Sequence, residues 1–299
     1  MVRRSSFAVG MIAGLGILAH ACGSPRFESV ASTSEAAAGV KFDHIVIILM
    51  ENHSYSEVYG TGMYMTQLAD QNVNLTNYQY VDHPSEPNYL AIASGQTFNP
   101  PSGDDAYHVF DAVNVVDRLE SVGLTWRAYS ESASAPCDTR NPDIRHLPFL
   151  FFADVVNDPA RCGRVVPTAP DSDAELIAEL NSTSPSNFLW LTPNDDHNMH
   201  DTDVATGDAY LADLVPRILG STTFSTRRAA LFIVFDEGSG SPGSDPIYAV
   251  WAGPVVSRGQ VFATAYVHYS ILATLEANWG FPPITSADAM ATPMIEVFQ

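Results

Sequence analysis

The chain has 299 residues, of which 46% are hydrophobic and 16% are charged, and its formal net charge is −20. This length and composition favour one large domain with a substantial core over two small domains. The acidic balance argues against nucleic acid and anionic membranes as partners, because like charges repel. An anionic substrate would therefore have to be attracted by the local charge of a bound metal rather than by the protein as a whole.

The N-terminal segment, residues 1–22, resembles an export signal, because a short basic start precedes an apolar stretch that ends in small residues. Two interpretations remain open. In the first, the segment is a lipoprotein signal and Cys22 becomes the lipidated first residue, which tethers the protein to the membrane of the cell envelope. In the second, the protein is secreted after cleavage nearby. Residues 23–39 are small and polar and predict a flexible linker, which leaves residues 40–299 as a single domain.

The pattern of residues 40–299 predicts an α/β fold with a mainly parallel central sheet and helices on both faces. Apolar runs predict buried strands, and the capped stretches between them predict helices. The predicted strands are residues 45–50, 73–80, 125–129, 187–191, 229–235 and 247–252. The predicted helices are residues 64–72, 89–94, 113–120, 172–181, 208–219 and 267–279. Because strands and helices alternate throughout, we expect the strands to run parallel.

Two of the predicted strands end abruptly in polar side chains. The run 45–50 is followed by Glu-Asn-His-Ser, and the run 229–235 is followed by Asp-Glu-Gly. In open α/β sheets, ligands bind just beyond the carboxyl ends of the strands. Each pair alone is as easily explained as a cap of the following turn, but the repetition favours a site for Ca²⁺, Mg²⁺ or Mn²⁺, which prefer oxygen ligands. The predicted ligands are Glu51, Asn52, Asp236 and Glu237.

A third strand, residues 187–191, leads into the polar loop 194–201. Such a loop is often polar merely because it is solvated, so we select only Asn194, for substrate binding, and His200, for catalysis. His268 stands at the start of the last predicted helix, where a cationic histidine is disfavoured. We expect its ring either to be neutral and to act as a donor or ligand, or to be exposed. The histidines expected to be structural are His44, His108 and His146.

Ser85 comes shortly before Pro87, which suits the first turn of a helix, and Gly95 provides a stop after residues 89–94. Ser85 is therefore predicted at or near a helix N-terminus, where backbone N–H groups can hold an anion. A serine in this position most commonly only caps its helix. Beside a metal, its hydroxyl is also a suitable nucleophile for a phosphate ester, because coordination stabilises the alkoxide.

Cys137 and Cys162 lie in an irregular segment, residues 132–170, that is rich in Pro, Asp and Asn. In an exported protein, a single pair of cysteines most simply forms a disulfide. Closing a loop of this size would stabilise the fold by roughly 3 kcal/mol. Metal binding by the pair is the weaker alternative, because the Cys-x-x-Cys spacing is absent.

Several motifs occur in the order found in a known family. Residues 42–60, an apolar strand followed by Glu-Asn-x-Ser and then Gly, resemble the opening motif of the phosphoesterase family that joins bacterial phospholipases C with acid phosphatases. HPSEPNYLAIASG, TPNDDHNMHD, LFIVFDEGSG and VHYSILATLEANWG are similar to its later motifs. The resemblance covers about residues 42–283 and implies an alkaline-phosphatase-like fold, in which a metal-activated hydroxyl forms a phosphoryl-enzyme intermediate.

The resemblance also implies roles for individual residues. Ser85 matches the position of the nucleophile, and Asn88 matches the amide that contacts phosphate. The residues that match the metal and histidine motifs are Glu51, Asn52, His200, Asp236, Glu237 and His268. Two departures leave questions open. The loop has His197-Asn198 where relatives often carry Asn-Asp, and Val267 stands where many relatives have an Asp that orients the following ring.

Together these features predict an exported, metal-dependent phosphoric-ester hydrolase, acting on a small phosphate ester or a phospholipid head group. The length of the chain favours the acid-phosphatase-like monoesterases over the longer phospholipases C. Two alternatives remain: a phospholipase C-type phosphodiesterase, and a cell-surface binding protein on a degenerate hydrolase fold. The joint presence of Glu51, Ser85, His200 and Asp236 argues against a binding protein, which would not need the full set.

Overall fold

The computed structural model describes residues 38–99 and 106–299. The predicted signal peptide (1–22), its Cys22 and nearly all of the predicted linker (23–39) lie outside the described residues. Within the described part of the chain, no helix has both the length and the apolar character needed to cross a membrane.

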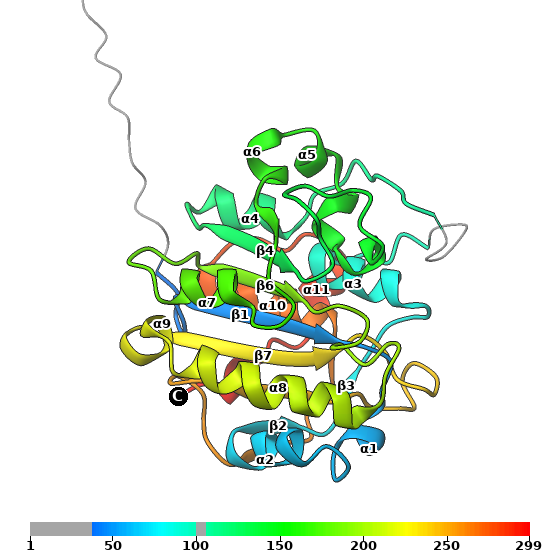
Figure 1. The fold of residues 1–299 in the computed structure, drawn as a ribbon, viewed down its shortest axis with the longest axis vertical. Coiled ribbons are helices and arrows are strands. Elements are labelled where there is room, and N and C mark those ends of the chain that lie inside the picture. The colour runs from blue at the N-terminus through cyan, green and yellow to red at the C-terminus, as the bar shows by residue number, and fades with distance from the viewer. Residues whose placement is uncertain (1–37, 100–105) are drawn as a thin grey trace, which may run out of the picture. The chain divides into compact units, whose positions relative to one another are not determined.

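An eight-stranded sheet forms the centre of the domain (Figure 1). Its strands are β1 (His44–Met50), β2 (Val73–Leu75), β4 (Trp126–Ser130), β5 (Val165–Pro167), β6 (Phe188–Thr192), β7 (Ala229–Phe235), β8 (Ala249–Ala252) and β9 (Gln260–Phe262). They lie side by side in the order β5-β4-β6-β1-β7-β8-β2-β9. Only β8 is antiparallel to its neighbours among these strands. The predicted α/β fold with a mainly parallel sheet is confirmed.

Helices lie on both sides of this sheet. In Figure 1, α7 (Ala174–Leu180) and α8 (Val204–Leu219) cross in front of the strands, and α10 (Tyr269–Trp279) lies behind them, packed against α3 (Ser85–Ser94). The other α-helices are α1 (Tyr55–Val58), α2 (Met63–Gln71), α4 (Val115–Ser121), α5 (Ala153–Val156), α6 (Pro159–Cys162), α9 (Thr222–Thr226) and α11 (Ser286–Met290). Short 3₁₀ helices are η2 (Ile144–His146), η3 (Pro148–Phe151) and η4 (Ile295–Val297).

The two central strands, β1 and β7, carry the core. Every residue of both strands is buried, which explains why each reads as an unbroken apolar run rather than an alternating one. They pair in parallel from His44 with Ala229 to Met50 with Phe235. The chain therefore leaves both strands at the same edge of the sheet, and this register determines which side chains meet there.

The structure adds α1, α9, β9 and α11 to the predicted elements and begins α8 at Val204 rather than at residue 208, and two further regions differ more strongly. The predicted strand 73–80 is wrong in its extent, because the chain turns after β2 and leaves the main sheet to form β3 (Tyr78–Gln79), which pairs with β10 (Tyr266–Val267). The irregular segment 132–170 contains η2, η3, α5, α6 and β5. These elements are too short for a periodic apolar pattern to reveal them. The predicted disulfide between Cys137 and Cys162 is present and links the two ends of this segment.

Glu276 on α10 is a buried carboxyl group, and its ionisation should make the stability of the fold depend on pH. Glu276 is 8% exposed, and burial together with the neighbouring Asp288 raises its pKa to about 8. The charged form is thus disfavoured in the folded state, so stability falls as the pH rises from about the ordinary value of 4.5 through 8. We expect Glu276→Gln to raise Tm at pH 8 by about 2–4 °C and to have little effect at pH 4.5, as measured by differential scanning fluorimetry. A difference in Tm that does not change with pH would contradict this assignment.

Candidate active site

Glu51 and Asp236 meet at the carboxyl edge of the sheet. Glu51 follows β1 and Asp236 follows β7, and the last residues of these strands, Met50 and Phe235, are register partners. The backbone N–H of Asp236 donates to the carbonyl oxygen of Met50 at 2.9 Å. Both acidic residues are 0% exposed. The sheet register thus brings two carboxyl groups into neighbouring positions from which water is excluded.

The electrostatics of this pair favour a bound cation. Burial and the charge of Asp236 raise the pKa of Glu51 well above its ordinary value. Burial also raises the pKa of Asp236, to about 6. Two neighbouring carboxyl groups in a region of low dielectric constant do not both ionise readily on their own. A metal ion between them would reverse this effect and hold both groups in the charged form.

Two oxygen atoms at the pair have no hydrogen-bond partner. Asp236 Oδ1 accepts hydrogen bonds from the backbone N–H groups of Asn52 at 3.0 Å and Glu237 at 2.6 Å. In contrast, Asp236 Oδ2 and Asn52 Oδ1 are buried and have no hydrogen-bond partner. Buried polar atoms without partners are costly. We call Glu51, Asn52 and Asp236 the first donor group, and its oxygen atoms fit a hard divalent cation.

Ser85 lies directly against the first donor group. It is the first residue of α3, is 3% exposed, and its Oγ donates to Glu51 Oε2 at 3.0 Å. Tyr89, one turn further along α3, donates its hydroxyl to Glu51 Oε1. Helix α3 therefore orients both oxygens of Glu51. It also places the Ser85 hydroxyl at a helix N-terminus, where the backbone favours an anion.

Glu237 and Asn88 hold the segment that precedes Ser85. Glu237 Oε2 lies 2.9 Å from His83 Nδ1 and 3.3 Å from Asn88 Nδ2. Asn88 Oδ1 accepts hydrogen bonds from the backbone of residues 81–82 at 3.0 and 3.2 Å. Both residues thus belong to the surroundings of Ser85. The metal-ligand role of Glu237 and the phosphate contact of Asn88 stay predictions.

His146 lies inside the site, although the sequence analysis expected it to be structural. Its ring is completely buried, with Nε2 3.3 Å from Glu51 Oε1 and Nδ1 3.4 Å from Asp195 Oδ1, and it stacks on Tyr89. Burial lowers the pKa of His146 to about 4, so the ring is neutral. No pattern in the sequence pointed to this residue, because it belongs to the three-residue helix η2 within the irregular segment 132–170.

Loop 194–201 carries a second donor group, formed by Asp195, His200 and Asp201. One potential ligand atom from each of these residues lies within 4.8 Å of the others. Arg145 binds Asp195 at 2.7 Å. Burial acts to raise the pKa of Asp195, but His146 and Arg145 outweigh it and hold that pKa below its ordinary value. The sequence analysis selected only His200 from this group.

Asn194 organises the same loop. Its Oδ1 accepts hydrogen bonds from the backbone N–H groups of Asp196 at 3.1 Å and His197 at 2.9 Å. This pattern forms a local turn, as Asn side chains often do. Its selection for substrate binding therefore stays a prediction, while the structure gives it a role in shaping the loop.

His268 is fully buried behind the carboxyl pair. Its Nε2 lies 2.5 Å from the carbonyl oxygen of Asp236, and its Nδ1 lies 3.4 Å from the hydroxyl of Tyr78. Burial lowers the pKa of His268 to about 4, so the ring is neutral. Because both ring nitrogens contact the protein, His268 holds the end of β7 in place, and its catalytic role stays a prediction.

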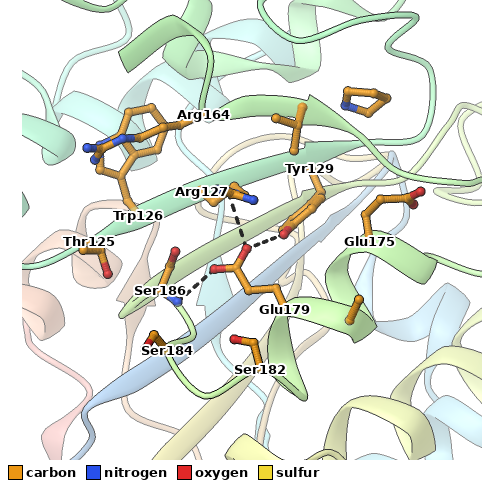
Figure 2. A pocket seen from close by; sticks show the side chains of 13 residues that line it. Thr125, Trp126, Arg127, Tyr129, Arg164, Glu175, Glu179, Ser182, Ser184 and Ser186 are labelled. Carbon is orange, nitrogen blue, oxygen red and sulfur yellow. Dashed lines mark hydrogen bonds and ion pairs between the residues drawn. The ribbon is translucent and has the colours of Figure 1, made fainter. Parts of the chain in front are cut away.

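A groove of about 740 Å³ lies along β4 and β5, against α7 (Figure 2). On its wall, Glu179 accepts hydrogen bonds from the hydroxyl of Tyr129 and from the backbone of Ser186. Arg127 lies 3.5 Å from the same carboxylate. None of the predicted site residues lines this groove. We therefore place the active site at the strand ends and not in this cavity.

Comparison with known proteins shows to which family the chain belongs. The model of the phosphoesterase family matches residues 62–282. The chain belongs to the phosphoesterase family. A probable acid phosphatase of Kluyveromyces lactis is 28% identical to this phosphoesterase, over 89% of this chain and 66% of the relative. A phosphate-repressible acid phosphatase of Penicillium chrysogenum is 26% identical, over 94% of this chain and 73% of the relative. A phosphatidylinositol-3-phosphatase of Mycobacterium tuberculosis is 26% identical, over 96% of this chain and 93% of the relative.

Solved structures identify the fold of this phosphoesterase. A protein of the alkaline phosphatase superfamily from Vibrio parahaemolyticus superposes with a TM-score of 0.58 at 14% identity, covering 81% of this chain and 68% of that one. The C-terminal periplasmic domain of EcEptC from Escherichia coli, in complex with Zn, gives a TM-score of 0.52 at 10% identity, covering 83% of this chain and 85% of that one. The predicted family and fold are confirmed, and the relatives support a phosphoric-ester hydrolase.

Because His146 lies between the two donor groups, we expect its substitution to lower the activity. His146→Ala removes the ring that contacts Glu51 and Asp195, so both carboxylates lose a neighbour that orients them. We expect kcat for an aryl phosphate to fall about 10–100-fold, the usual loss when a partner of a metal ligand is removed. Steady-state kinetics at saturating substrate would measure this.

The matched control is His44→Ala. The ring of His44 is also buried on β1, but it lies at the other end of the strand, where Nδ1 bonds the carbonyl oxygen of Ser186 at 2.9 Å. We expect this variant to lose stability and to keep its kcat. Wild-type kcat in His146→Ala would exclude His146 from the site.

Proposed function

We propose that this phosphoesterase is an exported, acid-phosphatase-like phosphomonoesterase that uses Ser85 as its nucleophile and a divalent cation as its cofactor. The observation that carries the proposal is the 3.0 Å hydrogen bond from Ser85 Oγ to Glu51 Oε2, formed at a helix N-terminus beside Asp236. The relatives named as acid phosphatases and as a phosphatidylinositol-3-phosphatase support a small phosphate ester or a phosphorylated lipid head group as substrate.

The first donor group would hold the cation, with Glu237 as a further ligand from the adjoining position. When bound, the cation supplies positive charge that favours an ionised serine oxygen and offsets the negative charge of the phosphoryl group. The all-oxygen donors of this group favour Ca²⁺, Mg²⁺ or Mn²⁺. We assign His200 of the second donor group to proton transfer rather than to a second ion, and the Zn complex of a structural relative is consistent with metal use.

The remaining chemistry falls to residues of the chain. Glu51 Oε2 fixes the Ser85 hydroxyl and accepts its hydrogen bond. The hydroxyl proton passes to Glu51 Oε2 as the serine oxygen attacks phosphorus, and the bond from phosphorus to the leaving oxygen breaks as the Ser–O–P bond forms. His200, whose side chain is 31% exposed at the rim of the site, is our proposed proton donor to the leaving oxygen. Water hydrolyses the phosphoserine in a second step and regenerates the hydroxyl.

Substitution of Ser85 tests the mechanism. We expect Ser85→Ala to lower kcat for 4-nitrophenyl phosphate by at least about 10³-fold, because the covalent route is lost. The matched control is Ser94→Ala in the same helix. Ser94 is equally buried, but its hydroxyl bonds the carbonyl oxygen of Leu90 at 2.9 Å, so this variant should retain activity.

Two further experiments, removal of the metal and a comparison of monoester with diester, test the reaction class. Removal of divalent ions with a chelator should abolish turnover, and addition of Ca²⁺, Mg²⁺ or Mn²⁺ should restore it. The diester bis(4-nitrophenyl) phosphate should be hydrolysed at least about tenfold more slowly than the monoester, as judged by kcat/KM. Unchanged turnover in Ser85→Ala would remove this serine from the nucleophile role, and faster turnover of the diester would favour a phospholipase C-type activity. Absence of turnover with every ester would favour a binding protein.

We also propose export, either to the cell envelope or to the medium. This proposal rests on residues 1–22, which resemble an export signal and end at Cys22. The mass of the mature N-terminus distinguishes the two outcomes. A lipid-modified Cys22 indicates anchoring in the envelope, an unmodified cleaved terminus indicates secretion, and an intact residue 1 in cells would contradict export.

A further inference from the structure

A buried polar cluster lies under loop 194–201, apart from both donor groups. It is formed by Glu131, which follows β4, Asp173, which precedes α7, His197 in the loop, and Tyr210 on α8. The rings of His197 and Tyr210 stack with centroids 4.4 Å apart. The two carboxyl groups are almost completely enclosed, since Glu131 is 6% and Asp173 is 1% exposed.

Each of these carboxylates is satisfied on one oxygen alone. Glu131 Oε2 accepts hydrogen bonds from the backbone of Asn194 at 2.9 Å and lies 2.7 Å from His197 Nδ1. Asp173 Oδ2 accepts a hydrogen bond from the hydroxyl of Tyr210 at 2.9 Å. The other oxygens, Glu131 Oε1 and Asp173 Oδ1, are buried and have no hydrogen-bond partner. Two unpaired carboxylate oxygens in one cluster require a compensating group, because a buried charge without a partner is strongly destabilising.

The charged residues around the cluster do not supply that group. Arg217 is the nearest guanidinium, but its Nη1 binds Asp213 at 3.0 Å and its Nη2 binds the carbonyl oxygen of Ser172. His197 is used by the other oxygen of Glu131. Burial and the charge of Glu131 raise the pKa of Asp173 to about 7, because they outweigh Tyr210, His197 and Arg217, which act to lower it.

A cavity of about 220 Å³ adjoins the cluster and is lined by Asp171, Asp173, His197, Tyr210 and Arg217 among others. This volume has room for an ion and several waters. The cavity borders Asp173, whereas Glu131 lies outside its lining, so an ion could reach the cluster from the Asp173 side together with water.

We propose that the cluster is a structural site for a hard divalent cation, separate from both donor groups. The ion would be held by Glu131 Oε1 and Asp173 Oδ1 with the Tyr210 hydroxyl and water. Ca²⁺ is the best fit, because it accepts mixed carboxylate, neutral oxygen and water ligands in flexible geometry. The ion would join the ends of β4 and α7 to the loop that carries the second donor group. It shares no residue with either donor group, so it does not rest on the proposed function.

The test counts bound ions. Wild-type chain, Asp173→Asn and Asp171→Asn are stripped with a chelator and titrated with Ca²⁺ by isothermal titration calorimetry. Asp173→Asn removes one charge, while the amide oxygen can accept the hydrogen bond that Tyr210 donates to Oδ2 in the wild type. Asp171 lies on the same cavity but is exposed. We expect the Asp173→Asn variant to bind one Ca²⁺ fewer than the wild type, and Asp171→Asn to bind the wild-type number.

The loss of one ion in Asp173→Asn does not depend on how many ions bind at the active site. Whether the wild-type chain binds one, two or three ions in total, the structural site is the one that Asp173→Asn loses. Ser85→Ala turnover tests the proposed function separately and has no bearing on this count. Equal stoichiometry in Asp173→Asn and the wild type would overturn the proposal.

A second measurement needs no variant and so does not depend on the folding of Asp173→Asn. Crystals of the wild-type chain grown with Mn²⁺, which scatters anomalously and binds oxygen ligands, should show an anomalous peak between the carboxylates of Glu131 and Asp173. An anomalous map with no peak there would overturn the proposal. It would indicate that the two carboxyl groups share a proton instead.

Discussion

The parallel pairing of β1 with β7 determines the chemistry of this protein, because it buries two carboxyl groups next to each other. Burying one unpaired charge is costly, and burying two of the same sign is more so. The surrounding side chains reduce this cost only in part. Ser85 and Tyr89 donate to the oxygens of Glu51, and backbone N–H groups donate to one oxygen of Asp236. The second oxygen of Asp236 remains without a donor, and the proposed cation would supply the missing partner.

Two hydrogen bonds hold the backbone behind the carboxyl pair in place. The backbone N–H of Glu51 donates to the carbonyl oxygen of Asn198 at 2.8 Å, which attaches the end of β1 to loop 194–201. His268 reaches the carbonyl oxygen of Asp236 from α10 and fixes the end of β7. His268 thus holds the backbone from which the side chain of Asp236 extends.

Much of this arrangement is predictable from the sequence, and the reason is the regularity of the sheet. The apolar run 229–235 coincides with β7, and the run 45–50 lies within β1. The rule that ligands bind beyond strand ends then leads directly to Glu51 and Asp236. Ser85 follows from Pro87, whose restricted backbone suits the first turn of a helix.

The remainder depends on side-chain directions in irregular segments, which no periodic pattern encodes. His146 belongs to a three-residue helix, and nothing in its local sequence distinguishes it from an exposed histidine. Within the loop, Asn194 and Asp195 are adjacent and equally polar, but the first forms a turn and the second faces His146. The split of residues 73–80 into β2 and β3 is likewise decided by the partner β10, which is almost two hundred residues away in the sequence.

Loop 194–201 lies between two buried acidic groups that have different access to solvent and substrate. On one side it accepts the backbone N–H of Glu51, and on the other it donates to Glu131 through Asn194 and His197. The first donor group faces a serine hydroxyl at a helix N-terminus, so a cation there would act on a reacting oxygen. The cluster of Glu131 and Asp173 is enclosed by aromatic rings, so a cation there would only hold the backbone in place. One short loop therefore contacts both groups and also carries Asp195 and His200.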